Sequence, residues 1–212
     1  MTREMVPKNR NSDGLRRSDL DPDPVQQFGQ WLSDAWEANI QDANATALAT
    51  ASADGRPDIR TVLLKGFDRR GFVFYTNYES KKARDISENP HVALLFLWVQ
   101  LRRQVRICGT AQKITTADSL RYFLSRPLGS RLGAWSSHQS SVITSRQILD
   151  MKMHEMKRKF ASGKVSLPSF WGGYRVNAES MEFWQGCEDR LHDRFLYTRE
   201  PGNNWRIERL AP

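Results

Sequence analysis

The sequence is poor in cysteine. Cys108 and Cys187 are the only two thiols among its 212 residues. Two cysteines cannot build the disulfide framework that stabilises small secreted domains. The low cysteine content therefore predicts a chain that works in a reducing compartment, the cytoplasm, with both thiols chemically inert.

Long hydrophobic runs are also missing. The longest apolar stretch, VALLFLWV at 92–99, has the length of a strand, whereas a membrane-spanning helix needs about 20 apolar residues. The N-terminal residues MTREMVPKNRNSDG contain no apolar segment of the kind found in secretory signals. We therefore expect neither export nor insertion into a membrane.

Several catalytic and metal-binding motifs are absent. The sequence has no CxxC pair, no HExxH, no GxxxxGK(S/T), no GxSxG, and no GxGxxG after an expected strand. A zinc site, a P-loop, a Rossmann dinucleotide site and a serine hydrolase therefore lack support. We expect no bound metal.

What the sequence does contain is enough material for one packed domain. Hydrophobic residues make up 39% and aromatic residues 10% of the chain, which is typical of a globular protein. Residues 1–22 are polar, charged and end in DPDP, and we interpret them as a mobile N-terminal arm. Residues 23–212 are expected to form a single domain.

Basic residues are distributed unevenly along the chain. The 32 Lys and Arg against 24 Asp and Glu give a formal net charge of +8, and between Arg60 and Arg106 ten basic residues oppose four acidic ones. A solvated basic surface, a nucleic-acid interface and a site for small anions would each account for this excess. Charge alone does not decide among them.

Hydrophobic periodicity predicts strands interrupted by helices. An amphipathic helix is expected from Pro24, and alternation at 45–52, 58–67 and 72–77 indicates three strands of an antiparallel meander. A short helix between Ser80 and Pro90 precedes strands at 91–99 and 102–114. Helices follow at 116–126 and 145–163, with a turn or short helix at 129–135, a loop at 165–173, and closing strands at 174–184, 190–199 and 204–210. This order predicts a mainly β, α+β fold: an antiparallel β-barrel with peripheral helices.

Two short segments have the composition of anion-binding sites. Ser80, Lys81 and Lys82 lie at the expected start of a helix, where free N–H groups and the helix dipole favour a phosphate. An ordinary helix cap with solvated lysines is the simpler interpretation of the same residues. Tyr122 and Arg126 are four residues apart on an expected helix and therefore share a face.

The segment RTVLLK contains two cations in an otherwise apolar strand. The offset between Arg60 and Lys65 is odd, so a regular strand cannot aim both side chains at one point, and a twist, a bulge or a strand end must reconcile them. Gln104, Gln139 and Ser140 are neutral amides and a hydroxyl that could recognise the edge of a heterocycle.

The segment FWQGCEDRLHDRF, at 183–195, concentrates positive charge beside a tryptophan. If the chain is extended from Arg190 onward, Arg190, His192 and Arg194 share one face. Such a row of cations repels itself unless a negative group lies in front of it. The segment therefore predicts a nearby anion.

Ten short motifs together resemble one enzyme family. In chain order they are RTVLLK, FYTN, SKKA, RQVR, YFLSRP, GAWSSHQSS, LPSFWGGYRV, EFWQG, RLHDRF and the terminal RLAP. The sequence from about Gly14 to Pro212 resembles the pyridoxine (pyridoxamine) 5'-phosphate oxidases. The resemblance implies an FMN-binding split β-barrel that forms a homodimer, with FMN at the subunit interface.

The resemblance also implies roles for individual residues. The residues that would surround FMN are Arg60, Thr61, Val62, Leu63, Leu64, Lys65, Tyr75, Thr76, Lys81, Lys82, Gln104, Gln139, Ser140, Trp184 and Arg194. Those that would hold a phosphorylated pyridine substrate are Lys65, Tyr122, Arg126, Ser130, Arg190 and His192. Of these, Arg190 and His192 would act at the reacting atoms, with Arg190 as an electrostatic aid because arginine does not lose its proton.

The implied reaction is the oxidation of pyridoxamine 5'-phosphate or pyridoxine 5'-phosphate to pyridoxal 5'-phosphate, with O2 as the acceptor and H2O2 released. FMN and substrate each carry a phosphate, which would answer the excess of cations. Two alternatives remain open at this point. The chain could be a related FMN-dependent oxidase of the phenazine-pathway type, or a flavin-binding or nucleic-acid-binding module without turnover.

Overall fold

The computed structural model describes residues 14–137, 139–161 and 163–212. The strands are β1 (Ala45–Ala51), β2 (Pro57–Leu63), β3 (Gly66–Asp68), β4 (Gly71–Asn77), β5 (His91–Trp98), β6 (Arg103–Lys113), β7 (Trp171–Gln185), β8 (Asp193–Arg199) and β9 (Trp205–Leu210). The helices are α1 (Pro24–Glu37), α2 (Lys81–Glu88), α3 (Thr116–Ser125), α4 (Leu128–Ser136) and α5 (Arg146–Lys159).

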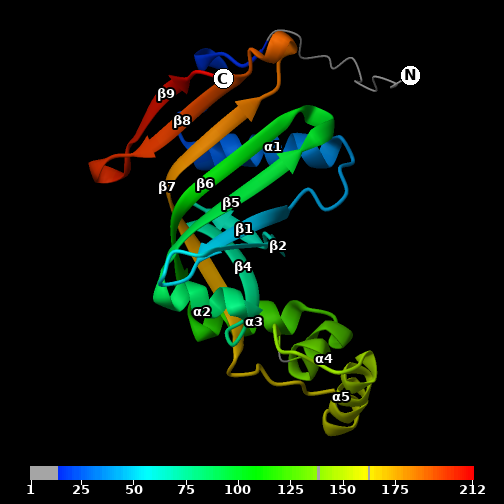
Figure 1. Cartoon of the computed structure of the whole chain (residues 1–212). Helices are drawn as coiled ribbons and strands as arrows, with labels where there is room; N and C mark the ends of the chain where they lie inside the picture. The colour runs from blue at the N-terminus through cyan, green and yellow to red at the C-terminus, as the bar shows by residue number, and fades with distance from the viewer. Residues whose placement is uncertain (1–13, 138, 162) are drawn as a thin grey trace.

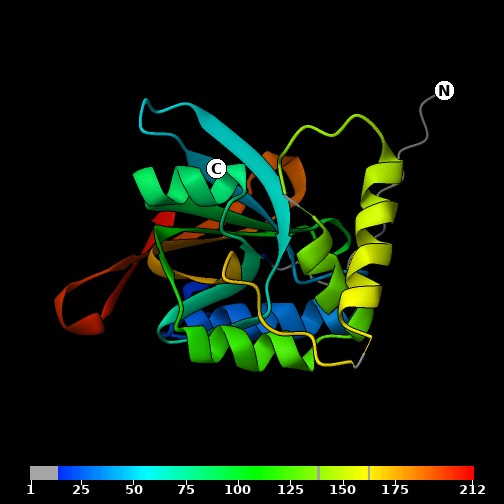
Figure 2. The same cartoon turned by 90° about the horizontal axis from the view of Figure 1, so that it is seen from below.

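The strands form one curled antiparallel sheet. Its order is β2-β1-β5-β6-β7-β4-β3, and β8 and β9 continue from the C-terminal half of β7. Helices α3, α4 and α5 gather at one end of the sheet, and α2 lies on the side opposite α5 (Figures 1 and 2). The predicted fold class, mainly β and antiparallel with peripheral helices, is confirmed.

Helix α1 closes the main core. Asp23 caps its N-terminus by accepting a hydrogen bond from the Val25 N–H, and Pro24 occupies the first turn, where proline is tolerated. The helix buries Phe28 completely, and the Phe28 ring meets those of Phe72 and Phe96 at centroid distances of 5.1 and 4.8 Å. A smaller cluster of buried side chains joins α3, α4 and α5 to the start of β7.

The strand expected at 58–67 is broken in two. Strand β2 ends at Leu63 and β3 begins at Gly66; β2 pairs with β1, whereas β3 pairs with β4. The simple meander is therefore wrong at this point, because the sheet is split between β2 and β4. Because the strand ends between Arg60 and Lys65, their odd spacing no longer points them to opposite faces. Both side chains line the same cavity.

Strand β7 contains a bulge that reverses its faces. Cys108 of β6 pairs with Ser180 and Gly109 pairs with Ala178, so Glu179 has no partner in the ladder. Before the bulge the side chains that enter the main core are at even positions, such as Val176; after it they are at odd positions, such as Phe183. A Cβ on Gly109 would lie 1.9 Å from the Asn177 carbonyl oxygen, so β6 accommodates the bulge only with glycine.

Residues 14–22, the described part of the expected arm, pack against β8 and β9. The Leu15 N–H donates to Asp193 Oδ2 at 2.8 Å, and Tyr197 Oη donates to the Asp21 carbonyl at 2.8 Å. Arg209 also donates to the Leu15 carbonyl at 3.1 Å. Residues 1–13, the rest of that arm, lie outside the described residues.

Candidate functional site

A cavity of about 870 Å³ lies between β2, β4, α2, α3, α4 and the segment after α4. It gathers many of the residues singled out in the sequence. Of the expected cofactor residues it is lined by Arg60, Thr61, Val62, Leu63, Lys65, Tyr75, Thr76, Lys81, Lys82, Gln139 and Ser140. Of the expected substrate residues it is lined by Lys65, Tyr122, Arg126 and Ser130.

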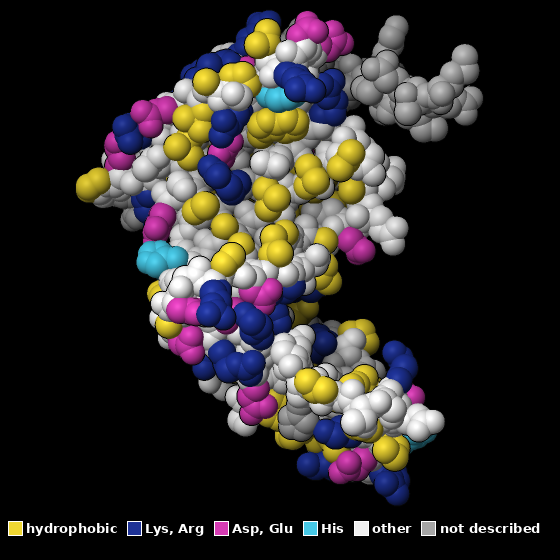
Figure 3. All heavy atoms as spheres, viewed as in Figure 1, with side chains coloured by type: hydrophobic (Ala, Val, Ile, Leu, Met, Phe, Trp, Pro, Cys, Tyr) yellow, Lys and Arg dark blue, Asp and Glu magenta, His cyan; other side chains and the backbone are white. Residues whose placement is uncertain are grey.

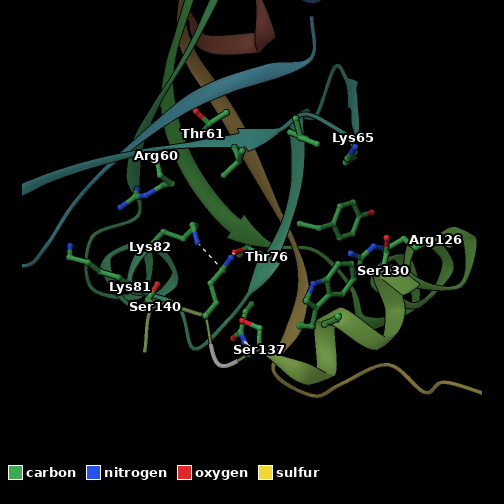
Figure 4. A pocket seen from close by; sticks show the side chains of 18 of the residues that line it. Arg60, Thr61, Lys65, Thr76, Lys81, Lys82, Arg126, Ser130, Ser137 and Ser140 are labelled. Carbon is green, nitrogen blue, oxygen red and sulfur yellow. Dashed lines mark hydrogen bonds between the residues drawn. The ribbon is translucent and has the colours of Figure 1, made fainter. Parts of the chain in front are cut away.

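Positive charge dominates the cavity wall. The charged lining residues are Arg60, Lys65, Lys81, Lys82, Arg84 and Arg126 against a single acid, Asp58. Lysines from α2 approach from one side and Arg126 from the other (Figure 4). Such a surplus of like charge in a hollow is favourable only when anions enter it.

Lys82 is the most deeply placed of these cations. It is 7% exposed, and its Nζ donates to Gln139 Oε1 at 3.0 Å and to Ser80 Oγ at 3.3 Å. Burial, together with the nearby Arg60 charge, lowers the pKa of Lys82 to about 8. Both of its acceptors are neutral, so a bound anion would relieve the unfavourable environment of the ammonium group.

Arg60 is held in place by neutral and acidic partners. Its Nη1 donates to Thr50 Oγ1 at 2.7 Å and to the Leu48 carbonyl at 3.2 Å. Its Nη2 forms an ion pair with Asp58, at 2.6 Å from Asp58 Oδ2, and lies 3.7 Å from Asp85 Oδ2. These neutral and acidic partners orient the guanidinium at the wall of the cavity.

Aromatic rings form the opposite wall of the cavity. Tyr75 and Tyr122 stack with their centroids 3.9 Å apart, and the Trp171 ring lies nearly parallel to both. Burial raises the pKa of Tyr122, so its phenol remains a hydrogen-bond donor at neutral pH. Arg126 reaches the same wall, and its Nη1 is buried without a hydrogen-bond partner.

A second group of expected site residues lies on one face of β6, β7 and β8. Gln104 pairs with Trp184, and Trp184 pairs with Arg194, so the three side chains share a face. The His192 ring lies 4.7 Å from that of Trp184. Together with Glu182, a buried acid on the same face, these residues are called the sheet-face cluster below.

The sheet-face cluster contains its own negative charge. Glu182 is 4% exposed and accepts from Arg106 at 2.5 Å and from Arg194 at 2.8 Å, through different carboxylate oxygens. Part of the negative charge that the sequence predicts beside this row of cations is therefore supplied by Glu182 of the same chain.

The expected strand beginning at Arg190 is wrong. Strand β8 starts at Asp193, and Arg190 ends a single 3-10 turn (Glu188–Arg190) with a left-handed φ of 60°. Arg190 is exposed and does not continue the row of His192 and Arg194. Asp189 is also left-handed, with a φ of 53°, and two successive such residues cannot belong to an extended strand.

The sheet-face cluster and the cavity are far apart within one chain. Gly172 of β7 pairs with the cavity residue Thr76, and Trp184 lies twelve positions further along the same strand. At ~3.3 Å per residue this is about 40 Å of strand. Gln104, Trp184, Arg190, His192 and Arg194 therefore do not line the cavity, and the Leu64 side chain is buried in the main core.

Sequence reasoning missed two cavity residues of consequence. Asp58 lies two positions before Arg60 in β2, so strand alternation was a signal that they share a face. Trp171 occurs in the motif LPSFWGGYRV, but no spacing rule connects it with Tyr122 or Arg126, which approach it from α3. Within the described residues there is no cluster of metal ligands, and no helix has the length and apolar character to cross a membrane.

Comparison with known proteins bears directly on these residues. A family model described as pyridoxamine 5'-phosphate oxidase matches residues 32–160. A second, described as the pyridoxine 5'-phosphate oxidase C-terminal dimerisation region, matches residues 171–212. The cavity falls mainly in the first match and the sheet-face cluster mainly in the second.

Curated relatives and solved structures agree with the family models. Proteins named pyridoxine/pyridoxamine 5'-phosphate oxidase from Rippkaea orientalis and Crocosphaera subtropica are 60% and 61% identical to this chain, each match covering 94% of both chains. The structure of PhzG from Burkholderia lata with tetrahydrophenazine-1-carboxylic acid matches with a TM-score of 0.87 and 31% identity, covering 94% of this chain and 98% of that one. An FMN-binding protein from Nostoc punctiforme, 18% identical with a TM-score of 0.71 over 91% of this chain and 98% of its own, shares the fold.

Proposed function

Because this chain belongs to the pyridoxamine 5'-phosphate oxidase family, we propose that it is an FMN-dependent oxidase with two phosphorylated substrates. It converts pyridoxamine 5'-phosphate and pyridoxine 5'-phosphate to pyridoxal 5'-phosphate, with O2 as the acceptor and H2O2 as a product; the amine substrate also consumes water and releases ammonia. The observation that carries the proposal is a cavity with six basic side chains and one acid, bounded by aromatic rings.

The residues around α2 fit the phosphate of FMN. Arg60 supplies an oriented guanidinium at the cavity wall, and the hydrogen bonds of the buried Lys82 ammonium go to neutral acceptors only. The N-terminus of α2 adds the positive end of its helix dipole beside them, with the Lys81 N–H donating to Ser140 Oγ at 3.2 Å. These groups would bind the phosphate, while Thr61–Leu63 of β2 and Thr76 of β4 would line the flavin; FMN itself supplies the two-electron redox chemistry.

The opposite wall fits the phosphate of the substrate. Tyr122 offers a phenol, Ser130 a hydroxyl, and Arg126 and Lys65 two positive charges. A guanidinium and a hydroxyl suit the oxygens of a phosphate dianion, and the aromatic wall suits a planar pyridine ring. Substrate binding in this half of the cavity would hold the ring beside the flavin.

The remaining site residues would come from a second copy of the chain. Trp184, Arg190, His192 and Arg194 belong to the segment matched by the dimerisation region, and they lie outside the cavity of their own chain. A homodimer with two-fold symmetry would place the sheet-face cluster of one protomer against the cavity of its partner. Apolar side chains are exposed at the end of β5 and in the turn after it, Leu97 and Val99 among them, and they offer area for that contact. Figure 3 shows hydrophobic side chains exposed over the sheet on the viewed face.

His192 is better suited to orient the substrate than to remove its proton. Its Nδ1 accepts the Cys187 N–H at 3.1 Å, so in the neutral ring the proton is on Nε2. Nε2–H would donate to the substrate hydroxyl or amine, and the permanent charge of Arg190 would stabilise negative charge there.

The phenazine-type alternative receives less support. The relative with that chemistry is 31% identical, against 60% and 61% for the two oxidases of vitamin B6 phosphates. Tyr122, Arg126 and Ser130 together also favour a phosphorylated substrate.

A direct assay tests the proposal. The flavin of the purified protein should bleach anaerobically when pyridoxamine 5'-phosphate is added, and aerobic turnover should release aldehyde and peroxide in equal amounts. A yellow protein that bleaches with neither phosphorylated substrate would contradict the proposed oxidase, and a colourless protein that binds no added FMN would contradict the flavin site.

A further inference from the structure

Arg126 is a partly buried cation without a carboxylate partner. It follows the last residue of α3 and faces the cavity beside Ser130 (Figure 4). Its Nη1 is buried without a hydrogen bond, and among the described residues no carboxylate lies within ion-pair distance of it. In contrast, Arg60 and Arg194 each pair with an acid.

The Arg126 guanidinium lies beside a tryptophan ring, whereas Arg60 and Arg194 lie beside acids. Arg126 Cζ lies 4.8 Å from the centroid of the Trp171 ring. Trp171 is 8% exposed and lies at angles of 11° and 6° to the rings of Tyr75 and Tyr122, while Phe123 meets it edge-on. The Trp171 ring is thus fixed by its neighbours and gives the guanidinium a rigid surface.

We propose that Trp171 is a positioning residue for the substrate phosphate, because its ring face fixes the Arg126 guanidinium without neutralising it. Trp171 thereby sets the preference of the site for phosphorylated over unphosphorylated substrates. This inference rests on the proposed function and deepens it.

The physical basis is the difference between a ring face and a carboxylate. A carboxylate would orient Arg126, but the substrate phosphate would have to compete with it for the same N–H groups. A ring face attracts the cation through its quadrupole and leaves the N–H groups in the plane of the guanidinium free. The charge remains available to the phosphate, and its direction is already set.

Two variants of the flavin-loaded enzyme test this role. Trp171→Met fills the space without a ring face and should raise KM for pyridoxamine 5'-phosphate about tenfold, with kcat within about twofold. Trp171→Phe keeps a smaller ring and should raise KM about threefold. With unphosphorylated pyridoxamine, KM should change less than it does with pyridoxamine 5'-phosphate in the same variant, because this substrate brings no phosphate to Arg126.

A double-mutant cycle separates positioning from packing. In an Arg126→Ala background, Trp171→Met should add less than about a twofold change in KM, because its effect passes through Arg126. An equal rise in KM in both backgrounds, or an equal loss on phosphorylated and unphosphorylated substrates, would overturn the inference. If Trp171→Met fails to load flavin, Trp171→Phe decides by the same comparison, and an unchanged KM in that variant counts against the role.

Failure of the inference is distinct from failure of the proposed function. A wild-type enzyme that oxidises pyridoxamine 5'-phosphate, together with Trp171 variants of normal KM, contradicts only the positioning role. A wild-type protein that oxidises neither phosphorylated substrate contradicts the proposed function and the inference with it.

Discussion

The cavity and the sheet-face cluster differ in how far their basic side chains are paired with acids. In the cavity, Lys82 and Arg126 face neutral groups or rings, and one acid stands against six basic side chains. On the sheet face, Glu182 accepts hydrogen bonds from Arg106 and Arg194 through its two carboxylate oxygens and offsets part of their charge. The cavity is therefore the part of the chain that is prepared for anions, and the sheet face offers mainly a ring, an amide and oriented donors.

The largest effects on activity are expected from a cavity variant, a sheet-face variant and their co-expression. Arg60→Ala and Arg194→Ala should each lower turnover at limiting FMN about a hundredfold, because each removes charged donors from the proposed site. Co-expressed, the two chains should recover about a quarter of wild-type activity, since half of randomly formed dimers contain one intact site of two. The measurement is specific activity of the purified mixture.

The matched control combines two cavity defects. Dimers of Arg60→Ala with Lys82→Ala contain no intact cavity and should show no recovery. If the Arg60→Ala and Arg194→Ala mixture is no more active than either variant alone, each site lies within one chain and the two-region model fails.

Within the cavity, removing a lysine without an acidic partner should weaken FMN binding more than removing one that is paired with acids. Lys82→Met should weaken FMN binding about thirtyfold or more, because it removes a buried ammonium whose hydrogen bonds go only to neutral acceptors. Lys81→Met should cost only severalfold, since Lys81 is half exposed and already pairs with Asp58 and Asp85. Fluorescence titration of FMN measures both affinities. Equal losses of FMN affinity in the two variants would show that the acidic partners of Lys81 make no difference.

The same lysine predicts a pH dependence. Because the pKa of Lys82 is about 8, its ammonium is present below pH 8 and is lost above it. FMN affinity should be level between about pH 7 and 8, where the phosphate is a dianion, and should then fall as pH rises. Lys82→Met should lack this fall; a wild-type affinity that stays constant up to pH 10 would argue against Lys82 as the group responsible.

The smallest expected effect is a change in stability caused by replacing Glu182 of the sheet-face cluster. Glu182→Gln should lower the free energy of unfolding by about 2 kcal/mol, because it leaves Arg106 and Arg194 without their acid while both remain partly solvated. Glu208→Gln, at an exposed pair with Arg206, should change it by less than about 0.5 kcal/mol. Urea unfolding measures both; equal values would show that the burial of Glu182 is irrelevant.

Much of the fold follows from local sequence patterns. Helix α1 and the strands β1, β4, β5 and β6 occur close to where periodicity predicts them, because one face of each is buried in the core. The break between β2 and β3 did not follow, since nothing in RTVLLKGF marks where pairing changes from β1 to β4. That change is decided by the curvature of the whole sheet.

The candidate site could be predicted less completely. Motifs indicated the residues that line the cavity, but they did not reveal that Gln104, Trp184 and Arg194 lie on another face of the same chain. Alternation from Arg190 failed because two left-handed residues, Asp189 and Arg190, precede β8. Backbone conformations of this kind depend on the surrounding contacts, which spacing along the chain does not encode.

The unpaired residue of β7 has a consequence for how this protein can change. Deleting Glu179 would restore an unbroken ladder with β6, but every later residue of the strand would point the opposite way. Met181 and Phe183 would turn to solvent, and Glu182 and Trp184 would be driven into the barrel interior. Insertions and deletions should therefore be tolerated in the loops around this strand and rejected within it, because one position decides which side chains a second protomer could meet.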